Sequence, residues 1–294
     1  MSRVDVLKTY KLFINGQFPR TESGRYYPVY NKQQKLIANL CRSSRKDFRN
    51  AVVAARAAQP GWASKSALLK SQILYRLAEM LEGRKQQIID ELVFQDIPLK
   101  KAEQEVLTAI DRIIYYSGWA DKFIQIYSTV NPVASSHFNF SLPEPTGVVS
   151  IIAPEEPSFL GLVSVILPVI VSGNTCVVLA SEKYGVNAIT FAEMLATSDL
   201  PAGVVNILTG FESELLPHFA NHMDVNAIIY TRQNPQSITT IQELSSLNVK
   251  RPIFWQKDWW NNEEAENPYL ILDACEIKTT WHPIENIGVS GGKY

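Results

Sequence analysis

Apolar residues recur at helical spacing through the first part of the chain. Leu69, Ile73, Leu77 and Leu81 are four residues apart, which places them on one face of an amphipathic helix. The same periodicity predicts helices over three ranges, 48–58, 68–92 and 100–123. Before them, residues 12–31 place polar turn residues between aromatic and β-branched runs, which predicts short strands joined by hairpins.

The pattern changes after residue 147 to short apolar runs separated by helical stretches. Strand signals occupy residues 147–153, 175–180, 203–208 and 225–230, and helical stretches lie near 159–171, 187–197 and 212–222. Strands that alternate with helices of this length predict a parallel sheet with crossover helices.

Residues 124–147 differ from both patterns. Their side chains alternate in character, and three prolines, Pro132, Pro143 and Pro145, interrupt them. We expect an extended excursion from the core because proline is poorly tolerated inside a helix. The chain shows no internal repeat, and we expect the glycine-rich end, residues 288–294, to be mobile.

Composition and charge narrow the class of protein. The 294 residues carry 28 basic and 29 acidic side chains and are 46% hydrophobic, which predicts a soluble chain with a sizeable core and no electrostatic affinity for nucleic acid or a membrane. The N-terminus lacks a signal-peptide core, and the longest apolar run, Phe159–Val171, is too short to span a bilayer. Three scattered cysteines match neither a disulfide framework nor a metal motif. A cytoplasmic location is therefore expected.

Two segments resemble the coenzyme domain of aldehyde dehydrogenases: SGNTCVVLASEKYGVNAITFAEML, residues 172–195, and LPAGVVNILTG, residues 200–210. The resemblance runs from about Lys11 to Gln256 and is nearest to the truncated second module of the two-module family sixteen enzymes. It implies an α/β fold, with a Rossmann-like parallel sheet, crossover helices, N-terminal helices and extended β oligomerisation arms. The implied coenzyme domain comprises residues 1–123 and 147–256, the arms comprise 124–146 and 265–294, and the catalytic domain is absent.

The catalytic groups that the resemblance implies are not visible. The family attacks an aldehyde with a cysteine thiolate in a GQxC-like loop, but Cys41, Cys176 and Cys275 lack that context and we expect each to be structural. Glu156 stands where the family's PWNFP-like motif has its oxyanion asparagine, and an ionised carboxylate cannot donate that hydrogen bond. Glu155 and Glu156 are either an acid/base pair or, as we favour, a solvated loop.

The ELGGK-like stretch that carries the family's general-base glutamate corresponds here to VKRPIFWQK, residues 249–257, without that glutamate. We therefore assign no catalytic residue and expect a pseudoenzyme.

The implied coenzyme site is also altered. LASE lacks the lysine of the family's KPSE motif, and YTRQ places Arg232 and Gln233 where the family has a glycine–serine pair. Ser181, Glu182 and Arg232 are the remaining candidates for cofactor binding, with NAD or NADP binding weakened. Arg232 either pairs with a phosphate or fills the vacated pocket.

Two further groups of residues have alternative interpretations. His218 and His222 have the i,i+4 spacing of metal ligands, but no third ligand is identifiable, so we expect a structural role and no metal. Trp259 and Trp260, in the polar stretch after Gln256, either contact a partner or cap apolar surface of the same chain.

The sequence therefore predicts a non-catalytic structural or regulatory subunit that assembles with itself or with a full-length aldehyde dehydrogenase. The tail LILDACEIKTTW, residues 270–281, is a candidate strand for extending a partner's sheet. Two alternatives remain open. The chain is one half of a split NAD(P)-dependent aldehyde dehydrogenase, or it senses NAD(P) without turnover.

Overall fold

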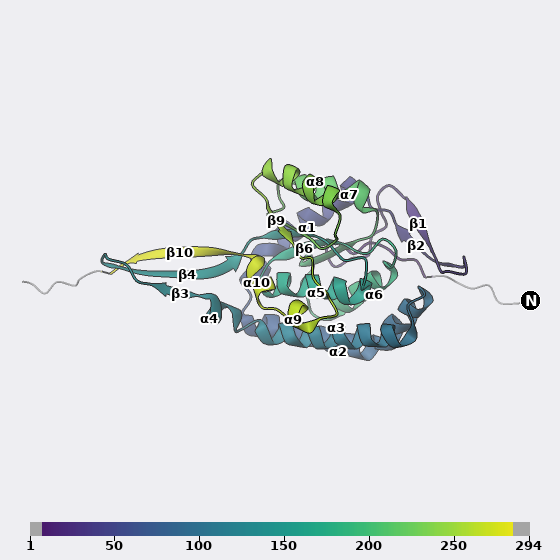
Figure 1. Ribbon diagram of the computed structural model, residues 1–294, viewed down its shortest axis with the longest axis horizontal. Helices are drawn as coiled ribbons and strands as arrows, with labels where there is room; N and C mark the ends of the chain where they lie inside the picture. Colours follow the sequence, from purple (N-terminus) through teal and green to yellow (C-terminus); the bar gives the residue numbers. More distant parts are fainter. Residues whose placement is uncertain (1–7, 285–294) are drawn as a thin grey trace, which may run out of the picture.

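The central element is a five-stranded parallel sheet. The structure is a computed structural model that describes residues 8–284. The strands lie in the order β7 (Val205–Leu208), β6 (Thr175–Leu179), β5 (Val148–Ile152), β8 (Ala227–Tyr230) and β9 (Arg251–Phe254). Each neighbouring pair is parallel. The α/β fold predicted from the sequence is therefore confirmed, and the chain builds outward from β5 in both directions (Figure 1).

Helices cover both faces of this sheet (Figure 1). One face carries α1 (Arg45–Ala63), α7 (Glu212–Asn221) and α8 (Pro235–Ser246). The other carries α5 (Ser158–Val171) and α6 (Val186–Thr197). Two long helices, α2 (Ala67–Phe94) and α3 (Leu99–Trp119), form an outer layer over α5 and α6. The sheet is consequently buried on both sides, as is usual for parallel sheets.

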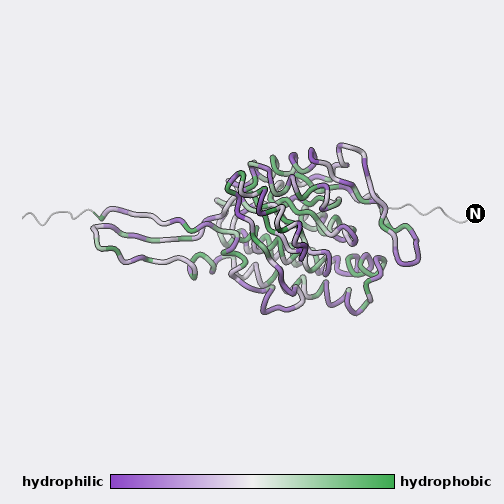
Figure 2. The backbone as a smooth tube through the Cα atoms, turned by 45° about the horizontal axis from the view of Figure 1, so that its top comes forward, coloured by the Kyte–Doolittle hydropathy of each residue, from purple (hydrophilic) through white to green (hydrophobic). Residues whose placement is uncertain are grey.

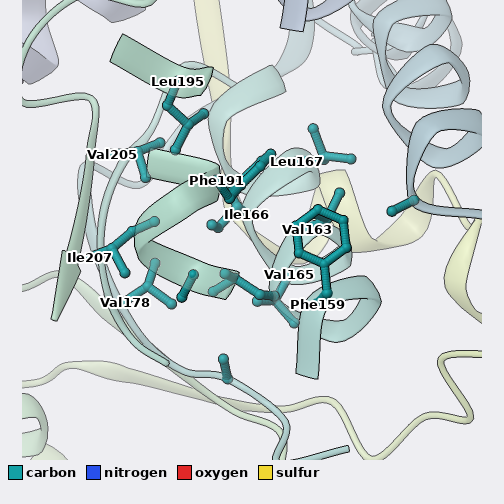
Figure 3. Close-up of a cluster of buried hydrophobic side chains, with 14 of the residues drawn as sticks. Phe159, Val163, Val165, Ile166, Leu167, Val178, Phe191, Leu195, Val205 and Ile207 are labelled. Atoms are coloured by element: carbon teal, nitrogen blue, oxygen red, sulfur yellow. The ribbon is translucent and has the colours of Figure 1, made fainter. Parts of the chain in front are cut away.

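Burial on both sides is visible in the four strands β5 to β8, which are buried at every position and mostly apolar. In β5, Val149 and Ile151 join the core beneath α5 and α6, whereas Val148 and Ile152 join the core beneath α1 and α7. The first core is shown in Figure 3, where side chains of α5 and α6 interlock with those of β6 and β7. Side chains alternate between the two faces of a strand, so a strand with two buried faces shows no polar alternation.

The N-terminal part forms a hairpin in which β1 (Tyr26–Tyr30) and β2 (Leu36–Cys41) are antiparallel. Its second strand lies beyond the predicted range 12–31, within which Ile14 and Gln17 form only an isolated bridge. Ser44 then caps α1, because its hydroxyl accepts from the main chain of Lys46 and Asp47 while the Asp47 carboxylate accepts from the Ser44 N–H. This reciprocal capping box starts α1 slightly before the predicted range.

A three-stranded antiparallel sheet projects from the body, and we call it the arm (Figures 1 and 2). It contains β3 (Thr129–Asn131), β4 (His137–Pro145) and β10 (Cys275–Pro283), with β4 in the middle. All nine residues of β10 pair with β4. The excursion predicted after residue 123 is extended only from Thr129, because α4 (Phe123–Tyr127) is helical and buries Phe123 against the core.

The connection from β9 to the arm packs on the body. It contains α9 (Asn262–Ala265) and α10 (Tyr269–Asp273), so the predicted tail strand begins at Cys275 and not at residue 270. Leu270 and Ile271 are buried in the core, which favours a helical turn there over an exposed strand. Trp259 is also buried, and Trp260 packs against the same core. Both tryptophans therefore cover apolar surface of the same chain, which is the second of the two predicted alternatives.

A buried arginine holds this connection to the body. Arg112 of α3 is fully buried and donates to the Ser164 hydroxyl of α5 at 2.7 Å, to the main-chain oxygen of Trp259 at 3.1 Å and to the Asn262 side chain at 2.8 Å. Its Nε lies 3.7 Å from a carboxylate oxygen of Glu266. One side chain thus joins two body helices to the segment that leads to the arm.

The glycine-rich end, expected to be mobile, lies outside the described residues, as does the last part of the predicted arm range 265–294. Within residues 8–284, no helix is both long and apolar enough to cross a bilayer.

Candidate functional site

Four loops meet where the parallel strands end, at the carboxyl end of the sheet. Glu155 follows β5, Ser181 and Glu182 follow β6, Glu212 opens α7 after β7, and Arg232 follows β8. The chain adds β6 and β7 on one side of β5, and then β8 and β9 on the other side, so the order of strand addition switches between β5 and β8. Open α/β sheets bind ligands at such switch points. The three predicted cofactor residues, Ser181, Glu182 and Arg232, therefore do lie together.

The Arg232 guanidinium is surrounded by carboxylates. Its Nη2 lies 2.5 Å from Glu155, and its Nη1 lies 2.9 Å from Glu212 and 3.3 Å from Glu182. The remaining N–H groups face main-chain oxygens, those of Ala153 at 2.9 Å and Ala180 at 3.4 Å. A guanidinium has five N–H donors. All five are accounted for by oxygens of the protein itself.

The carboxylates are themselves held in place. Glu155 accepts from the Ser181 hydroxyl at 2.7 Å and from the Glu182 main-chain N–H at 3.1 Å. Glu212 accepts from the Tyr230 hydroxyl at 2.9 Å, and from a second hydroxyl, that of Ser237, at 2.7 Å. These bonds fix both carboxylates toward the guanidinium. The group formed by Arg232, Glu155, Glu182 and Glu212 is called the Arg232 cluster below.

The Arg232 cluster carries excess negative charge, since three carboxylates surround one guanidinium. This charge affects the pKa values of two neighbouring tyrosines, Tyr27 and Tyr230. Burial raises the pKa of Tyr27, and Glu182 and Glu155 raise it further. Burial, assisted by Glu212, raises the pKa of Tyr230 to about 12. In this arrangement a phosphate brought to Arg232 would meet the like charge of the three carboxylates and find no free guanidinium donor.

Two members of the cluster, Glu155 and Glu212, were not predicted from the sequence to belong to this site. The sequence signal for Glu155 is its position, because it lies two residues after the predicted strand 147–153, close to where Ser181 stands relative to the predicted strand 175–180. The structure separates the two glutamates, because Glu156 is exposed and lies 3.7 Å from the Lys183 ammonium. They do not form an acid/base pair.

A second buried carboxylate occupies the start of α5. Glu105 of α3 accepts from the main-chain N–H groups of Phe159 at 2.7 Å and Leu160 at 3.1 Å. Burial raises the pKa of Glu105. The first N–H groups of a helix are natural donors to a developing oxyanion, and here a side chain already uses them. An acidic residue within the apolar stripe of a predicted helix was the available sequence signal.

The three cysteines, Cys41, Cys176 and Cys275, are all buried. Burial raises the pKa of the Cys41 and Cys176 thiols, and raises that of Cys275 to about 12. A cysteine nucleophile attacks as the thiolate. None of these thiols is therefore arranged for nucleophilic attack.

Comparison with known proteins identifies the family. The family model described as the aldehyde dehydrogenase family matches residues 18–258. The chain belongs to the aldehyde dehydrogenase family. Retinal dehydrogenase 2 of Gallus gallus is 30% identical over 251 residues, which are 83% of this chain and 48% of the relative. Omega-crystallin of Nototodarus sloanii is 28% identical over a match of 83% of this chain and 50% of the relative.

Solved structures give the same result for the fold of this aldehyde dehydrogenase family member. PnpE from Pseudomonas sp. WBC-3 superimposes with a TM-score of 0.79 at 25% identity, covering 84% of this chain and 50% of that one. The NAD+ complex of an aldehyde dehydrogenase from Bacillus cereus gives the same TM-score at 24% identity, covering 84% and 50%, and shows the shared fold alone. The chain spans about half the length of the relatives it matches.

His218 lies in the last turn of α7, and His222 caps the end of that helix. No group of three or more potential metal ligands occurs within the described residues 8–284. His222 accepts from the Asp224 main-chain N–H through Nδ1 at 3.2 Å, and its ring meets the Phe48 ring edge-on at 5.7 Å. Three cationic side chains, those of Arg45, Arg49 and Lys250, act on this histidine pair against one acidic group, Asp224, and this excess of positive charge disfavours a metal cation.

Proposed function

We propose that this aldehyde dehydrogenase family member is a non-catalytic structural or regulatory subunit that acts by assembling with another copy of itself or with a full-length aldehyde dehydrogenase. The observation that carries this proposal is the Arg232 cluster, in which the protein's own carboxylates occupy the guanidinium at the coenzyme end of the sheet. The buried thiols and the capped start of α5 support the same conclusion.

The arm supports assembly. It projects from the body with β3 and β10 as its two outer strands (Figure 1). Val130, Ile277 and Trp281 are more than half exposed on these strands. Outer strands carry unpaired main-chain groups, and exposed apolar side chains beside them favour contact with another protein.

Coenzyme binding tests the non-catalytic part of the proposal. Wild-type protein is titrated calorimetrically with NAD+ and NADP+, with a full-length aldehyde dehydrogenase as the positive control. We expect no binding at coenzyme concentrations up to about 1 mM, because the carboxylates of the Arg232 cluster occupy the guanidinium. That concentration limit corresponds to a binding free energy of about 4 kcal/mol. A dissociation constant in the micromolar range would refute this part and favour a nucleotide-sensing module.

Assembly is tested by substitutions in β10. Deleting residues 267–294 would remove the buried Leu270 and Ile271 together with the strand, so point substitutions separate assembly from folding. Ile277→Asp with Trp281→Asp places charge on one face of β10, and Thr280→Asp is the matched control on the opposite face. We expect light scattering to show a fall in mass for the first variant alone, with unchanged circular dichroism. A monomeric wild-type protein that also captures no aldehyde dehydrogenase would contradict the proposal.

The second candidate is one half of a split NAD(P)-dependent aldehyde dehydrogenase. It is favoured by the preserved five-stranded sheet, which resembles the fold of the Bacillus cereus NAD+ complex. Addition of a separate catalytic-domain chain would then produce aldehyde-dependent NAD(P)H, and that activity would change on Glu156→Asn or Arg232→Gly substitution. Activity that is insensitive to both substitutions would favour a scaffolding role.

A further inference from the structure

A groove between α1 and α7 is lined by cationic and titratable side chains. Its volume is about 320 Å³, and Arg45 and Arg49 of α1 line it together with His218 of α7 and His222, which caps the end of α7. Phe48 lies in the same groove and stacks on Phe219 with ring centroids 4.2 Å apart, which fixes the separation of the two helices. The groove lies on the outer face of the body, in a different place from the Arg232 cluster.

The charge in this groove is unbalanced. No aspartate or glutamate lines it, and among the described residues neither Arg45 nor Arg49 has an ion-pair partner. The nearest acidic group acting on His222 is Asp224, in the turn after α7. Lys250, just before β9, is buried and adds a further positive charge, with its ammonium 2.7 Å from the main-chain oxygen of His222.

The histidines respond to these surroundings. Burial lowers the pKa of His218, and Arg45 lowers it further. Burial lowers the pKa of His222, where Asp224 opposes the effect and Lys250, Arg45 and Arg49 reinforce it. Both rings are therefore neutral near pH 7, and the hydrogen bond to Nδ1 of His222 leaves its proton on Nε2. A bound anion would offset the positive charge of the neighbouring side chains and would therefore raise the pKa of both histidines.

We propose that this groove binds a small phosphate-type anion, either inorganic phosphate or a compact phosphomonoester. Two guanidinium groups supply planar pairs of donors that match phosphate oxygens, and two imidazoles add donors from the facing helix. The volume of about 320 Å³ suits a compact anion and is small for a dinucleotide. A divalent cation is disfavoured by the same arginines, which explains why the histidine spacing does not mark a metal site.

The chain offers a direct measurement, because it contains only four histidines. His218 and His222 line the groove, whereas His137 and His282 lie on the arm and serve as internal references. The ring signals are assigned with histidine-to-glutamine variants and followed by NMR during titration with sodium phosphate, with sodium chloride at equal ionic strength as the control. We expect saturable shifts at His218 and His222, and a higher pKa for both, with phosphate alone.

A parallel titration with glycerol phosphate distinguishes the two ligand sources. Tighter binding than that of inorganic phosphate would assign a phosphomonoester, and weaker binding would assign the free anion. Shifts that sodium chloride reproduces, or an absence of shifts with both phosphates up to about 50 mM, would overturn the proposal, since that concentration corresponds to an affinity of only about 2 kcal/mol.

Two arginine variants complete the test. Arg45→Gln with Arg49→Gln is expected to weaken phosphate binding at least about tenfold, since bonds to charged groups are the strong ones. Arg76→Gln is the matched control, because Arg76 is an exposed arginine of α2 that pairs with Asp199 and lies outside the groove. Both groove arginines are exposed, so folding should be retained and is checked by circular dichroism. Equal affinity in the double variant and the control would overturn the assignment.

Discussion

Arg232 Nη1 lies 2.9 Å from the Oε2 atom of Glu212, which joins the end of β8 to the first turn of α7. The contact closes the carboxyl end of the sheet with groups from the protein itself. Glu155 and Glu182 approach the same guanidinium from the ends of β5 and β6. Residues from the ends of four strands thus form one internal ion cluster.

Removal of the cation from this cluster should be costly. Arg232→Ala leaves three carboxylates facing one another, two of them mostly buried, and we expect the free energy of unfolding to fall by about 1 to 3 kcal/mol. Arg76→Ala, which breaks an exposed pair with Asp199, is expected to cost less than about 1 kcal/mol. Urea denaturation measures both. Equal costs would show that the cluster contributes no more than a surface ion pair.

Arg112 should prove essential for holding the segment between β9 and the arm. Arg112→Met leaves the Asn262 side chain and the Trp259 main-chain oxygen without their donor, and we expect a loss of about 2 to 4 kcal/mol. Trp259 should become exposed, so its fluorescence should shift to longer wavelength. Arg112→Lys keeps the charge without the planar pair of donors and should be intermediate. Fluorescence unchanged in both variants would refute this anchoring role.

Lys250 should make stability depend on alkaline pH. Burial lowers its pKa from 10.5 to about 8, so between these values the unfolded chain binds more protons than the folded chain. This group therefore costs stability below pH 8, and the cost is relieved as pH rises toward 10.5, by on the order of 3 kcal/mol. Denaturation of wild type and Lys250→Met across that window should give a difference that grows in favour of wild type. A pH-independent difference would contradict the prediction.

Thiol reactivity offers a simple check of the buried cysteines. Cys41, Cys176 and Cys275 should not react with Ellman's reagent in the native protein, because the reactive thiolate is disfavoured by burial in each case. All three should react in urea. A thiol that reacts rapidly under native conditions would be a candidate nucleophile and would weaken the non-catalytic proposal.

Local patterns predicted most of the fold. The runs VVSII and TCVVL each carry four apolar residues and only one small polar one, which is typical of strands covered on both faces, and both lie in the parallel sheet. The strand β9 was not predicted, since RPIF is short, begins with a charge and contains Pro252. It joins the sheet because pairing with β8 satisfies its main chain, which is a property of its neighbour and not of its own composition.

The sequence by itself determined the family and the order of most strands and helices, because local motifs and hydrophobic periodicities encode both. Tertiary structure alone decided that Arg232 is engaged by three carboxylates rather than free for a phosphate, and that Leu270 starts no strand but packs into the core. It also decided that Arg45 and Arg49 line one groove with two histidines. Those outcomes depend on which distant residues the fold places within a few ångströms of one another, and charge and burial act at that distance regardless of sequence separation.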